Sequence, residues 1–284
     1  MVAPAAKREV AMCLIQERQL SQRRACDLAG IPTCSLRYQS RRQDDMPVRG
    51  RLKELAQERP RFGYRRLGVL LRREGHPINL KRVLRLYREE GLKLRSKKRK
   101  RITSAQRVRP EATTAINQMW SMDFVSDTLS CGRRFRGLNI IDCHSREALC
   151  SEVDTSLTGQ RVVRVLQWLS ETRGLPETIQ VDNGPEFTGR ALDEWAFRNR
   201  VKLRFIEPGK PVQNAIIESF NGKMRDECLN QEWFTNLQQA RNSIELWRED
   251  YNMVRPHSSL GNLPPAIWAQ QQQKLTENLY AQVR

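Results

Sequence analysis

The chain has 284 residues, and its 50 Lys and Arg outnumber its 32 Asp and Glu, which gives a formal net charge of +18. This excess of positive charge predicts a polyanionic partner. The charge is unevenly distributed: residues 1–110 hold 30 basic and 10 acidic side chains, whereas residues 111–284 hold 20 basic and 22 acidic ones. No apolar run approaches the ~20 residues of a membrane span, and no signal-peptide core opens the chain, so we expect no membrane partner.

The first forty residues predict a helix-turn-helix. Helical periodicity runs over residues 7–19, Ser21 is a suitable N-cap for a second helix, and Gly30-Ile31-Pro32 ends that helix before a third. An ordinary helical hairpin would give the same pattern. The surrounding arginines favour DNA, and Arg23 and Arg24 in the first turn of the second helix are expected to contact phosphates.

Residues 46–95 predict a second helical module that follows a short polar linker. Apolar residues recur at helical spacing and are assigned to its core, and Asn79 is expected to cap the last helix. Arg65 and Arg66 lie on the helix faces opposite these apolar positions. They are expected to lie in solvent or against phosphates rather than to read bases.

A basic run lies in the connection that we assign to residues 96–115. Such runs are either solvated or track phosphates without reading sequence, and we favour the second role because the run joins a DNA-binding half to a nuclease-like half. The run consists of Lys97, Lys98, Arg99, Lys100 and Arg101.

From Asn117 the pattern changes from helical periodicity to short β-rich runs. From the residues alone, the order of elements predicts an α/β fold with a mixed sheet. The expected strands are 119–125, 135–143, 148–154, 179–181 and 203–206, and the expected helices are 160–172, one capped by Thr188, one around Glu218 and one through 237–251.

Three carboxylates stand in this second half. Asp123 lies in an apolar, strand-like run, Asp182 follows a buried strand and precedes a strong turn signal, and Glu218 lies on a helical pattern. Thirty-five residues separate Asp182 from Glu218. Taken singly, either aspartate would be an ordinary strand-edge or turn residue, and the glutamate an ordinary helix-surface acid.

Together these motifs resemble the DDE triad of the retroviral integrase and transposase superfamily. The segments 220–229 and 250–261 narrow the resemblance to the catalytic, OrfB-type transposases of bacterial insertion sequence family 3, and it runs from about Ser21 to Trp268. It implies a ribonuclease-H-like core with a mixed five-stranded sheet and a C-terminal helix over residues 116–270. Helix-turn-helix-like modules at 1–45 and 46–95 would precede this core, and a tail at 271–284 would follow it.

The resemblance implies a DNA transposase that binds the ends of its element and catalyses metal-dependent strand cleavage and strand transfer. Asp123, Asp182 and Glu218 would be both the catalytic and the metal-binding residues. Carboxylate oxygens suit Mg²⁺ or Mn²⁺, and two such ions are expected, whereas seven scattered Cys without a CxxC pair and three His do not support zinc.

The expected partners are the terminal repeats of the element and target DNA, with the protein acting as a homo-oligomer on DNA in the bacterial cytoplasm, associated with the nucleoid. The resemblance also implies an upstream helix-turn-helix and leucine-zipper protein, although no heptad run is visible in the first forty residues. The odd cysteine count fits a reducing cytosol.

Several residues near these motifs stay open to more than one interpretation. Lys223 and Arg225, on or near the Glu218 helix, would contact DNA or lie on a helix surface. Asp142 competes with the triad from a strand end and would support the site indirectly. His144 and His257 receive no catalytic role, and His257 is expected to order the turn that contains it.

Two other functions fit parts of the pattern. One is a regulator of transposition that binds DNA through an inactive core, which three intact acids disfavour. The other is a ribonuclease-H-like nuclease that cuts RNA in hybrids, which two helical DNA-binding modules disfavour.

Overall fold

The computed structural model describes residues 4–37, 45–94, 113–207 and 214–282, and the side chains within 6–275. The chain divides into two compact units, Met1–Pro47 and Val48–Arg284. The second unit contains both the second helical module and the β-rich half. Within the described ranges, none of the helices combines the length and the apolarity that crossing a membrane would require.

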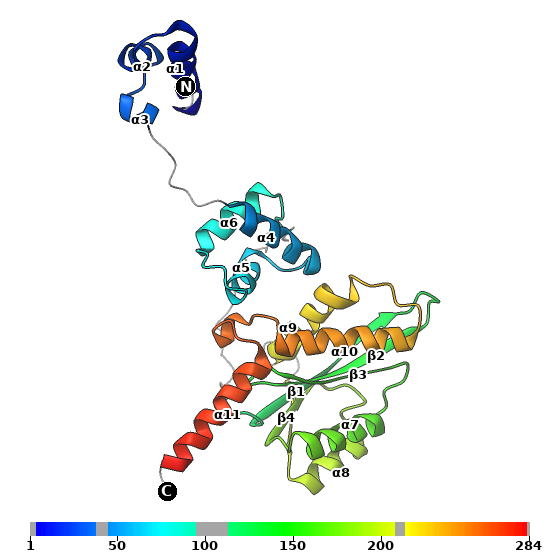
Figure 1. Ribbon diagram of the computed structural model, residues 1–284. Helices are drawn as coiled ribbons and strands as arrows, with labels where there is room; N and C mark the ends of the chain where they lie inside the picture. Colours follow the sequence, from blue (N-terminus) through cyan, green and yellow to red (C-terminus); the bar gives the residue numbers. More distant parts are fainter. Residues whose placement is uncertain (1–3, 38–44, 95–112, 208–213, 283–284) are drawn as a thin grey trace. The chain divides into compact units, whose positions relative to one another are not determined.

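The first unit is helical, as expected. It contains α1 (Pro4–Arg18), α2 (Gln22–Ala29) and α3 (Thr33–Arg37), packed around buried Ala11, Cys26 and Ile31 (Figure 1). Ser21 caps α2 by accepting the backbone N–H of Arg24 at 3.4 Å, which confirms the predicted cap. Gly30 ends the helix with φ of 64°, a conformation that glycine adopts without steric cost.

The second helical module consists of α4 (Met46–Glu58), α5 (Tyr64–Arg73) and α6 (Leu80–Glu89). Its leucines form a separate core in which Leu52, Leu67 and Leu71 are fully buried. Asn79 caps α6 through a 2.9 Å bond from the N–H of Lys81, as the sequence predicted. Local capping chemistry therefore fixes the start of this helix.

The β-rich half is built on one five-stranded sheet in the order β3-β2-β1-β4-β5. The antiparallel strands β1, β2 and β3 are followed by β4 and β5, which run parallel to β1, so the predicted mixed sheet is confirmed. The strands are β1 (Met119–Thr128), β2 (Arg134–Asp142), β3 (Ala148–Asp154), β4 (Thr178–Val181) and β5 (Lys202–Phe205).

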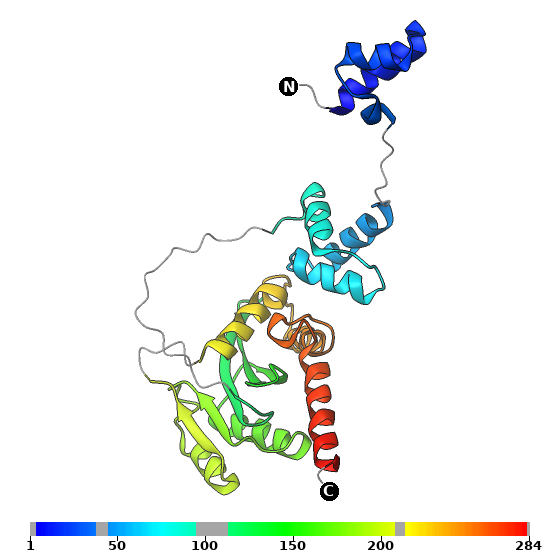
Figure 2. The ribbon, with the colours of Figure 1, turned by 90° about the vertical axis from the view of Figure 1, so that its left-hand side faces the viewer.

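Helices cover both faces of this sheet (Figures 1 and 2). On one face α7 (Gly159–Thr172) and α8 (Arg190–Asn199) share a core with the sheet, and on the other face α9 (Ala215–Met224) and α10 (Leu237–Met253) do so. A π-helical turn, Arg225–Leu229, directly continues α9, and a short 3-10 turn, Ser258–Leu260, precedes α11 (Pro265–Gln282). The core is thus a three-layer α/β sandwich.

Two local expectations differ from the structure. The N-cap of α8 is Gly189 and not Thr188, because the N–H of Thr188 is still bonded to the carbonyl of Gly184 in the preceding turn. The last helix, α11, begins at Pro265 and continues across residue 270, where the core was expected to end. Proline suits the first position of a helix, since its missing N–H needs no partner there.

Candidate active site

The register of the sheet brings the two aspartates together. β1 and β4 are parallel neighbours, and Ser121 on β1 is paired with Gln180 on β4. Two residues beyond this last pair lie Asp123 and Asp182, so the register directs both aspartates to the same end of the two neighbouring strands. A β4 strand that ends at Val181 leaves Asp182 at the carboxyl edge of the sheet, where ligands of α/β proteins bind.

Asp182 is held by the turn that follows it. Its Oδ1 accepts the backbone N–H of Gly184 at 3.0 Å, which fixes the carboxylate against its own turn. A Cβ at position 184 would lie 3.0 Å from the same oxygen, so a larger residue here would push the carboxylate aside. Glycine at position 184 therefore allows the backbone of the turn to approach the Asp182 carboxylate closely.

Glu218 approaches from α9, whose start is tied to the same two strands. Asn214, which immediately precedes α9, is buried, and its Oδ1 accepts bonds from the Ser121 hydroxyl at 2.9 Å and from the side-chain amide of Gln180 at 3.5 Å. Glu218 itself is exposed in the first turn of the helix. The helix start is thereby positioned beside β1 and β4.

The three acids share one electrostatic environment. Burial first, and then the negative charges of Asp182 and Glu218, raise the pKa of Asp123 to about 6, although bonds from the Phe124 N–H and from Asn221 oppose the shift. Repulsion of this kind acts between carboxylates that lie near one another. The structure thus brings all three acids that the sequence predicted to one edge of the sheet.

The donor chemistry of this edge fits a hard divalent cation. All three groups are carboxylates, and Mg²⁺ and Mn²⁺ prefer such oxygen ligands. Within the described ranges, no group of three or more His, Cys, Asp or Glu is gathered closely enough to hold a metal ion. The arrangement is therefore a half-buried aspartate pair that an exposed glutamate approaches, rather than a closed cage.

The raised pKa of Asp123 predicts how the metal-free protein responds to pH. A carboxyl whose folded pKa is about 6 against an ordinary 3.8 favours folding at low pH, and this contribution is lost as pH rises from about 4 through 6. In chelator, Asp123→Asn should therefore gain stability relative to wild type over that window, by on the order of 1–2 kcal/mol after allowance for partial exposure. Urea unfolding at pH 4 and pH 7 measures the difference, and a gap that does not change with pH would contradict it.

The residues predicted to contact DNA lie in several environments. Arg23, Arg24 and Arg65 are exposed, and residues 97–101 lie outside the described residues. Arg225 is exposed on the π-turn and donates to the carbonyl of Ser126 at 2.9 Å. Burial, followed by repulsion from Arg255 and Arg66, lowers the pKa of Lys223 to about 8.

Arg66 belongs to an ion-pair network within the second unit. It donates to Glu227 at 3.0 Å, and the same carboxylate accepts two bonds from Arg255, at 2.7 and 2.6 Å. Arg255 is only 1% exposed. Arg59 adds a two-bond pair to Asp250, at 2.5 and 2.6 Å, so the helical module and the core are joined by buried and half-buried charges.

Asp142, His144 and His257 make structural contacts. Asp142 is fully buried, and its Oδ1 accepts the N–H and hydroxyl of Ser145, at 2.6 and 2.8 Å, while Oδ2 accepts the Asn117 N–H. It therefore closes the β2–β3 turn rather than supporting the triad. His144 contacts the Thr113 carbonyl, and buried His257 lies 3.3 Å from the Arg255 guanidinium, with its pKa lowered to about 2 by burial and adjacent cations.

Sequence reasoning missed Asn139 and Ser151, which connect indirectly to Asp123. Asn139 is fully buried, and its neighbours along β2, Leu138 and Ile140, are buried apolar residues. A polar residue at an inward position of an apolar strand was the available signal, since buried amides need partners.

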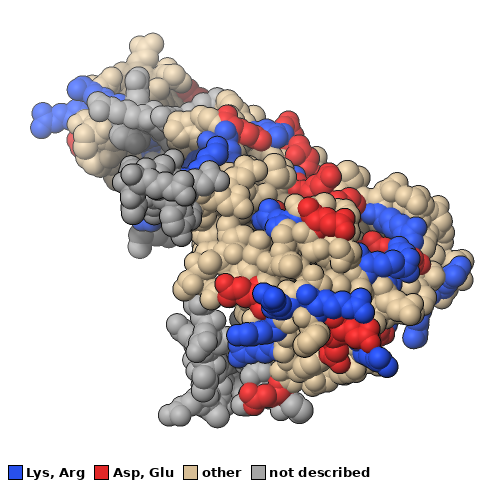
Figure 3. All heavy atoms as spheres, turned by 90° about the horizontal axis from the view of Figure 1, so that it is seen from below, with Lys and Arg blue, Asp and Glu red and all other residues tan. Residues whose placement is uncertain are grey.

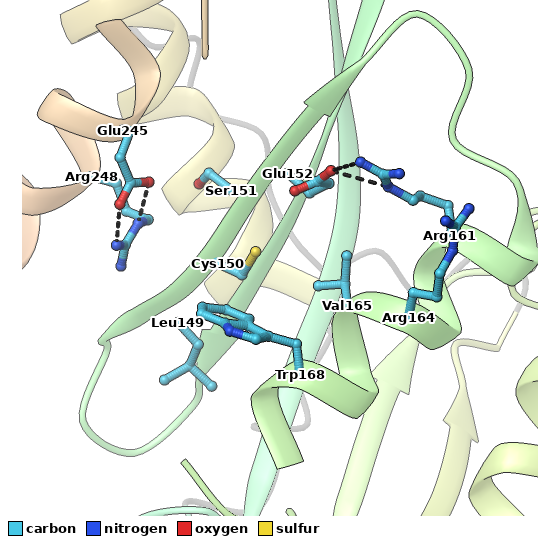
Figure 4. A pocket seen from close by; sticks show the side chains of 10 residues that line it. All are labelled: Leu149, Cys150, Ser151, Glu152, Arg161, Arg164, Val165, Trp168, Glu245 and Arg248. Carbon is cyan, nitrogen blue, oxygen red and sulfur yellow. Dashed lines mark hydrogen bonds and ion pairs between the residues drawn. The ribbon is translucent and has the colours of Figure 1, made fainter. Parts of the chain in front are cut away.

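Two further concavities lie in the second unit. One, of about 360 Å³, lies among β3, α7 and α10 and contains two closed ion pairs, Glu152–Arg161 and Glu245–Arg248, beside half-exposed Trp168 (Figure 4). The other, of about 540 Å³, lies beside α9 and is lined in part by Arg65, Arg66 and Lys223. The second cavity shares its helix with Glu218.

The surface charge of the core differs from that of the first third of the chain. On the face in Figure 3, acidic and basic side chains are interspersed, and neither sign forms one continuous field. This agrees with the near balance of 20 basic and 22 acidic residues over 111–284. The excess of positive charge in the sequence therefore lies in residues 1–110.

Comparison with known families agrees with this architecture. Residues 43–100 match an HTH-like domain, and residues 113–211 and 199–265 match two models of the integrase core domain. The simian T-cell lymphotropic virus intasome contains a chain with a TM-score of 0.50 and 16% identity, covering 77% of this chain and 74% of that one. The core is thus of the ribonuclease-H-like integrase type.

Curated relatives cover nearly the whole chain. An uncharacterized 31.7 kDa protein of insertion element IS407 from Burkholderia multivorans is 48% identical over 91% of this chain and 94% of its own length. The transposase InsD of insertion element IS2 from Escherichia coli is 30% identical over 82% of this chain and 81% of its own length. Because the matches span the HTH-like module and the integrase core alike, the chain belongs to the insertion-element transposases.

Proposed function

We propose that the integrase core of this transposase cleaves and transfers DNA strands at the ends of its element, with Asp123, Asp182 and Glu218 as the catalytic residues. The observation that carries the proposal is the register of β1 and β4, which sets Asp123 beside Asp182 while the charge of Glu218 acts on the same site. Two Mg²⁺ or Mn²⁺ ions would be held by these carboxylates and would activate the attacking oxygen and stabilise the leaving one.

The protein side chains would prepare this chemistry by position. The Gly184 N–H fixes one oxygen of Asp182, and the Phe124 N–H and the Asn221 amide each fix one oxygen of Asp123, so both carboxylates are held in a restricted orientation. Asn214 holds the start of the Glu218 helix against both strands. Such preorganisation lowers the barrier because little reorganisation is left for the reacting state.

A labelled terminal-repeat oligonucleotide tests the proposal. Incubation with the protein and Mg²⁺ or Mn²⁺ should yield a cleaved strand and then a strand-transfer product, and excess chelator should remove both. DNA binding without cleavage would indicate a regulator with an inactive core. Cleavage of only the RNA strand of a hybrid would indicate a ribonuclease-H-like nuclease.

DNA affinity would come mainly from the modules that we assign to residues 1–45 and 46–95 and from the connection at 96–115. Their net charge of +20 within residues 1–110 supports this assignment. The cavity beside α9 supports a path toward the catalytic edge, since Arg65, Arg66 and Lys223 all line it. Assembly as an oligomer on DNA, and an upstream helix-turn-helix and leucine-zipper partner, stay predictions of the family resemblance.

Removing two charges from the first unit should weaken DNA binding without changing sequence preference. Arg23 and Arg24 are exposed in the first turn of α2, a position that crosses the DNA backbone in a helix-turn-helix. The double variant Arg23→Gln, Arg24→Gln should lower affinity for all duplexes alike and reduce the slope of log K against log salt by about 2. Fluorescence anisotropy at several salt concentrations measures both quantities.

The matched control is Arg190→Gln, Arg198→Gln, which removes two exposed charges from α8 of the core. This control should leave the salt slope nearly unchanged. An equal loss in both double variants would mean that only net charge matters, and a loss confined to one duplex sequence would mean that Arg23 and Arg24 read bases.

A further inference from the structure

A row of polar side chains crosses three strands behind the candidate active site. Asp123 on β1 is paired with Asn139 on β2, and Asn139 is paired with Ser151 on β3. Paired residues on neighbouring strands project from the same face of a sheet, so the three side chains share one face. It is the face that α9 covers, since Asn221 of that helix reaches Asp123.

Hydrogen bonds join this row to Asp123 in one continuous series, in which every bond runs in the same donor-to-acceptor direction. The Ser151 hydroxyl donates to Asn139 Oδ1 at 2.8 Å, Asn139 Nδ2 donates to Asn221 Oδ1 at 2.7 Å, and Asn221 Nδ2 donates to Asp123 Oδ2 at 2.8 Å. The carboxylate can only accept, so Asn221 must present its amide nitrogen to Asp123 and its carbonyl to Asn139. The same reasoning fixes the orientation of the Asn139 amide, and every donor in this series of bonds therefore points toward Asp123.

Asn139, in the middle of this series of hydrogen bonds, is the most constrained of these side chains. Asn139 is 0% exposed, and its Nδ2 also lies 3.5 Å from the Met224 sulfur, which closes it off from solvent. A buried amide cannot exchange its partners for water without a large penalty, so its orientation is strongly fixed. Ser151 is only half-buried and ends the chain at β3.

We propose that Asn139 and Ser151 are positioning residues that orient the Asp123 carboxylate for its divalent cation by acting through Asn221. The inference rests on the proposed function, since it requires Asp123 to bind the metal. Outer partners of metal-binding side chains fix their orientation, and their loss typically weakens metal affinity by 10–100-fold. Here the outer shell extends across two strands and one helix.

The test is a titration with Mn²⁺ alone, followed by electron paramagnetic resonance of the free ion. Asn139→Leu keeps the branched shape of the side chain but removes the bonds to Ser151 and Asn221, and should raise the dissociation constant about tenfold. Ser151→Ala removes only the last donor and should raise it about threefold. Ser151→Thr, which keeps the hydroxyl, should bind Mn²⁺ like the wild-type protein.

Ser145→Ala is the matched control for Ser151→Ala. It also removes one hydroxyl donor, a 2.8 Å bond from the β2–β3 turn to Asp142, and within the described residues Ser145 has no bond to the triad. Melting curves in chelator show whether any variant is loosened, and anisotropy in chelator shows whether DNA binding is intact. If Asn139→Leu does not fold, the comparison of the Ser151 and Ser145 variants decides the question.

Wild-type affinity in both Asn139→Leu and Ser151→Ala would overturn the inference and leave the proposed function standing. A similar loss of affinity in Ser145→Ala would overturn it as well, because the effect would then be general loosening. Failure of the wild-type protein to bind Mn²⁺ would overturn the proposed function and the inference together.

Discussion

Asp182→Asn is expected to reduce strand cleavage about 10³-fold or more while DNA binding in chelator is unchanged. The amide keeps the size of the side chain and its bond to the Gly184 N–H, so the turn should survive. It removes one anionic ligand and with it several kcal/mol of metal-dependent stabilisation of the reacting phosphate, of which about 4 kcal/mol corresponds to 10³-fold. A single-turnover assay with a terminal-repeat duplex measures the loss.

The other two acids should behave alike. Asp123→Asn and Glu218→Gln remove ligands of the same site, and losses within one catalytic unit are not additive, so a triple variant should be little worse than any single one. In the absence of metal at pH 7, the melting temperature of Asp123→Asn should rise, because burial and the repulsion from Asp182 and Glu218 disfavour its charged form, and that of Asp182→Asn should hold steady or rise slightly. Near-normal cleavage by any variant, or wild-type cleavage in excess chelator, would contradict the metal-triad mechanism.

Glu227→Ala should produce the largest loss of stability outside the core apolar residues. Its carboxylate is the acid that pairs with buried Arg255 and with Arg66, and its removal would leave a guanidinium that is 1% exposed without its counter-ion. Breaking a buried pair in this way costs about 3–5 kcal/mol. For a unit of this size the melting temperature should fall by roughly 10 °C, measured by circular dichroism.

The control is Glu194→Ala on α8, which breaks exposed pairs with Arg190 and Arg198. Exposed pairs contribute little, and we expect a change within about 0.5 kcal/mol. Equal melting temperatures for the two variants would mean that the Glu227 network is solvated in solution and does not join the helical module to the core.

Local features of the fold were predictable because their causes are local. β3 was expected at 148–154 and occupies Ala148–Asp154, since alternation and flanking turns define it within a few residues. Ser21 and Asn79 were expected as caps and serve as caps, because their oxygens bond N–H groups two or three residues away. Thr188 failed as a cap because the preceding turn at Gly184 extends one residue further than the sequence suggested.

The three acids were also predicted from the sequence, by motif and spacing. Asp182 before its turn and Asp123 within an apolar run resembled one known constellation, and the parallel pairing of β1 with β4 sets the two side by side. The sequence could not say how each carboxylate is held. That depends on the register between strands distant in sequence and on the docking of α9, which together bring Asn221 and Asn214 to the site.

The sequence by itself determined the fold class and the family, and it predicted the three acids, because periodicity, turn chemistry and motif spacing are written along the chain. Only the tertiary structure decided the partners of the polar side chains. Arg66 was expected to lie in solvent or against phosphate and instead pairs with Glu227, 161 residues away. Asn139 stood out in the sequence only as a polar residue within an apolar strand, and its partners could not be named, since a hydrogen-bonded row across three strands exists only once their register is set.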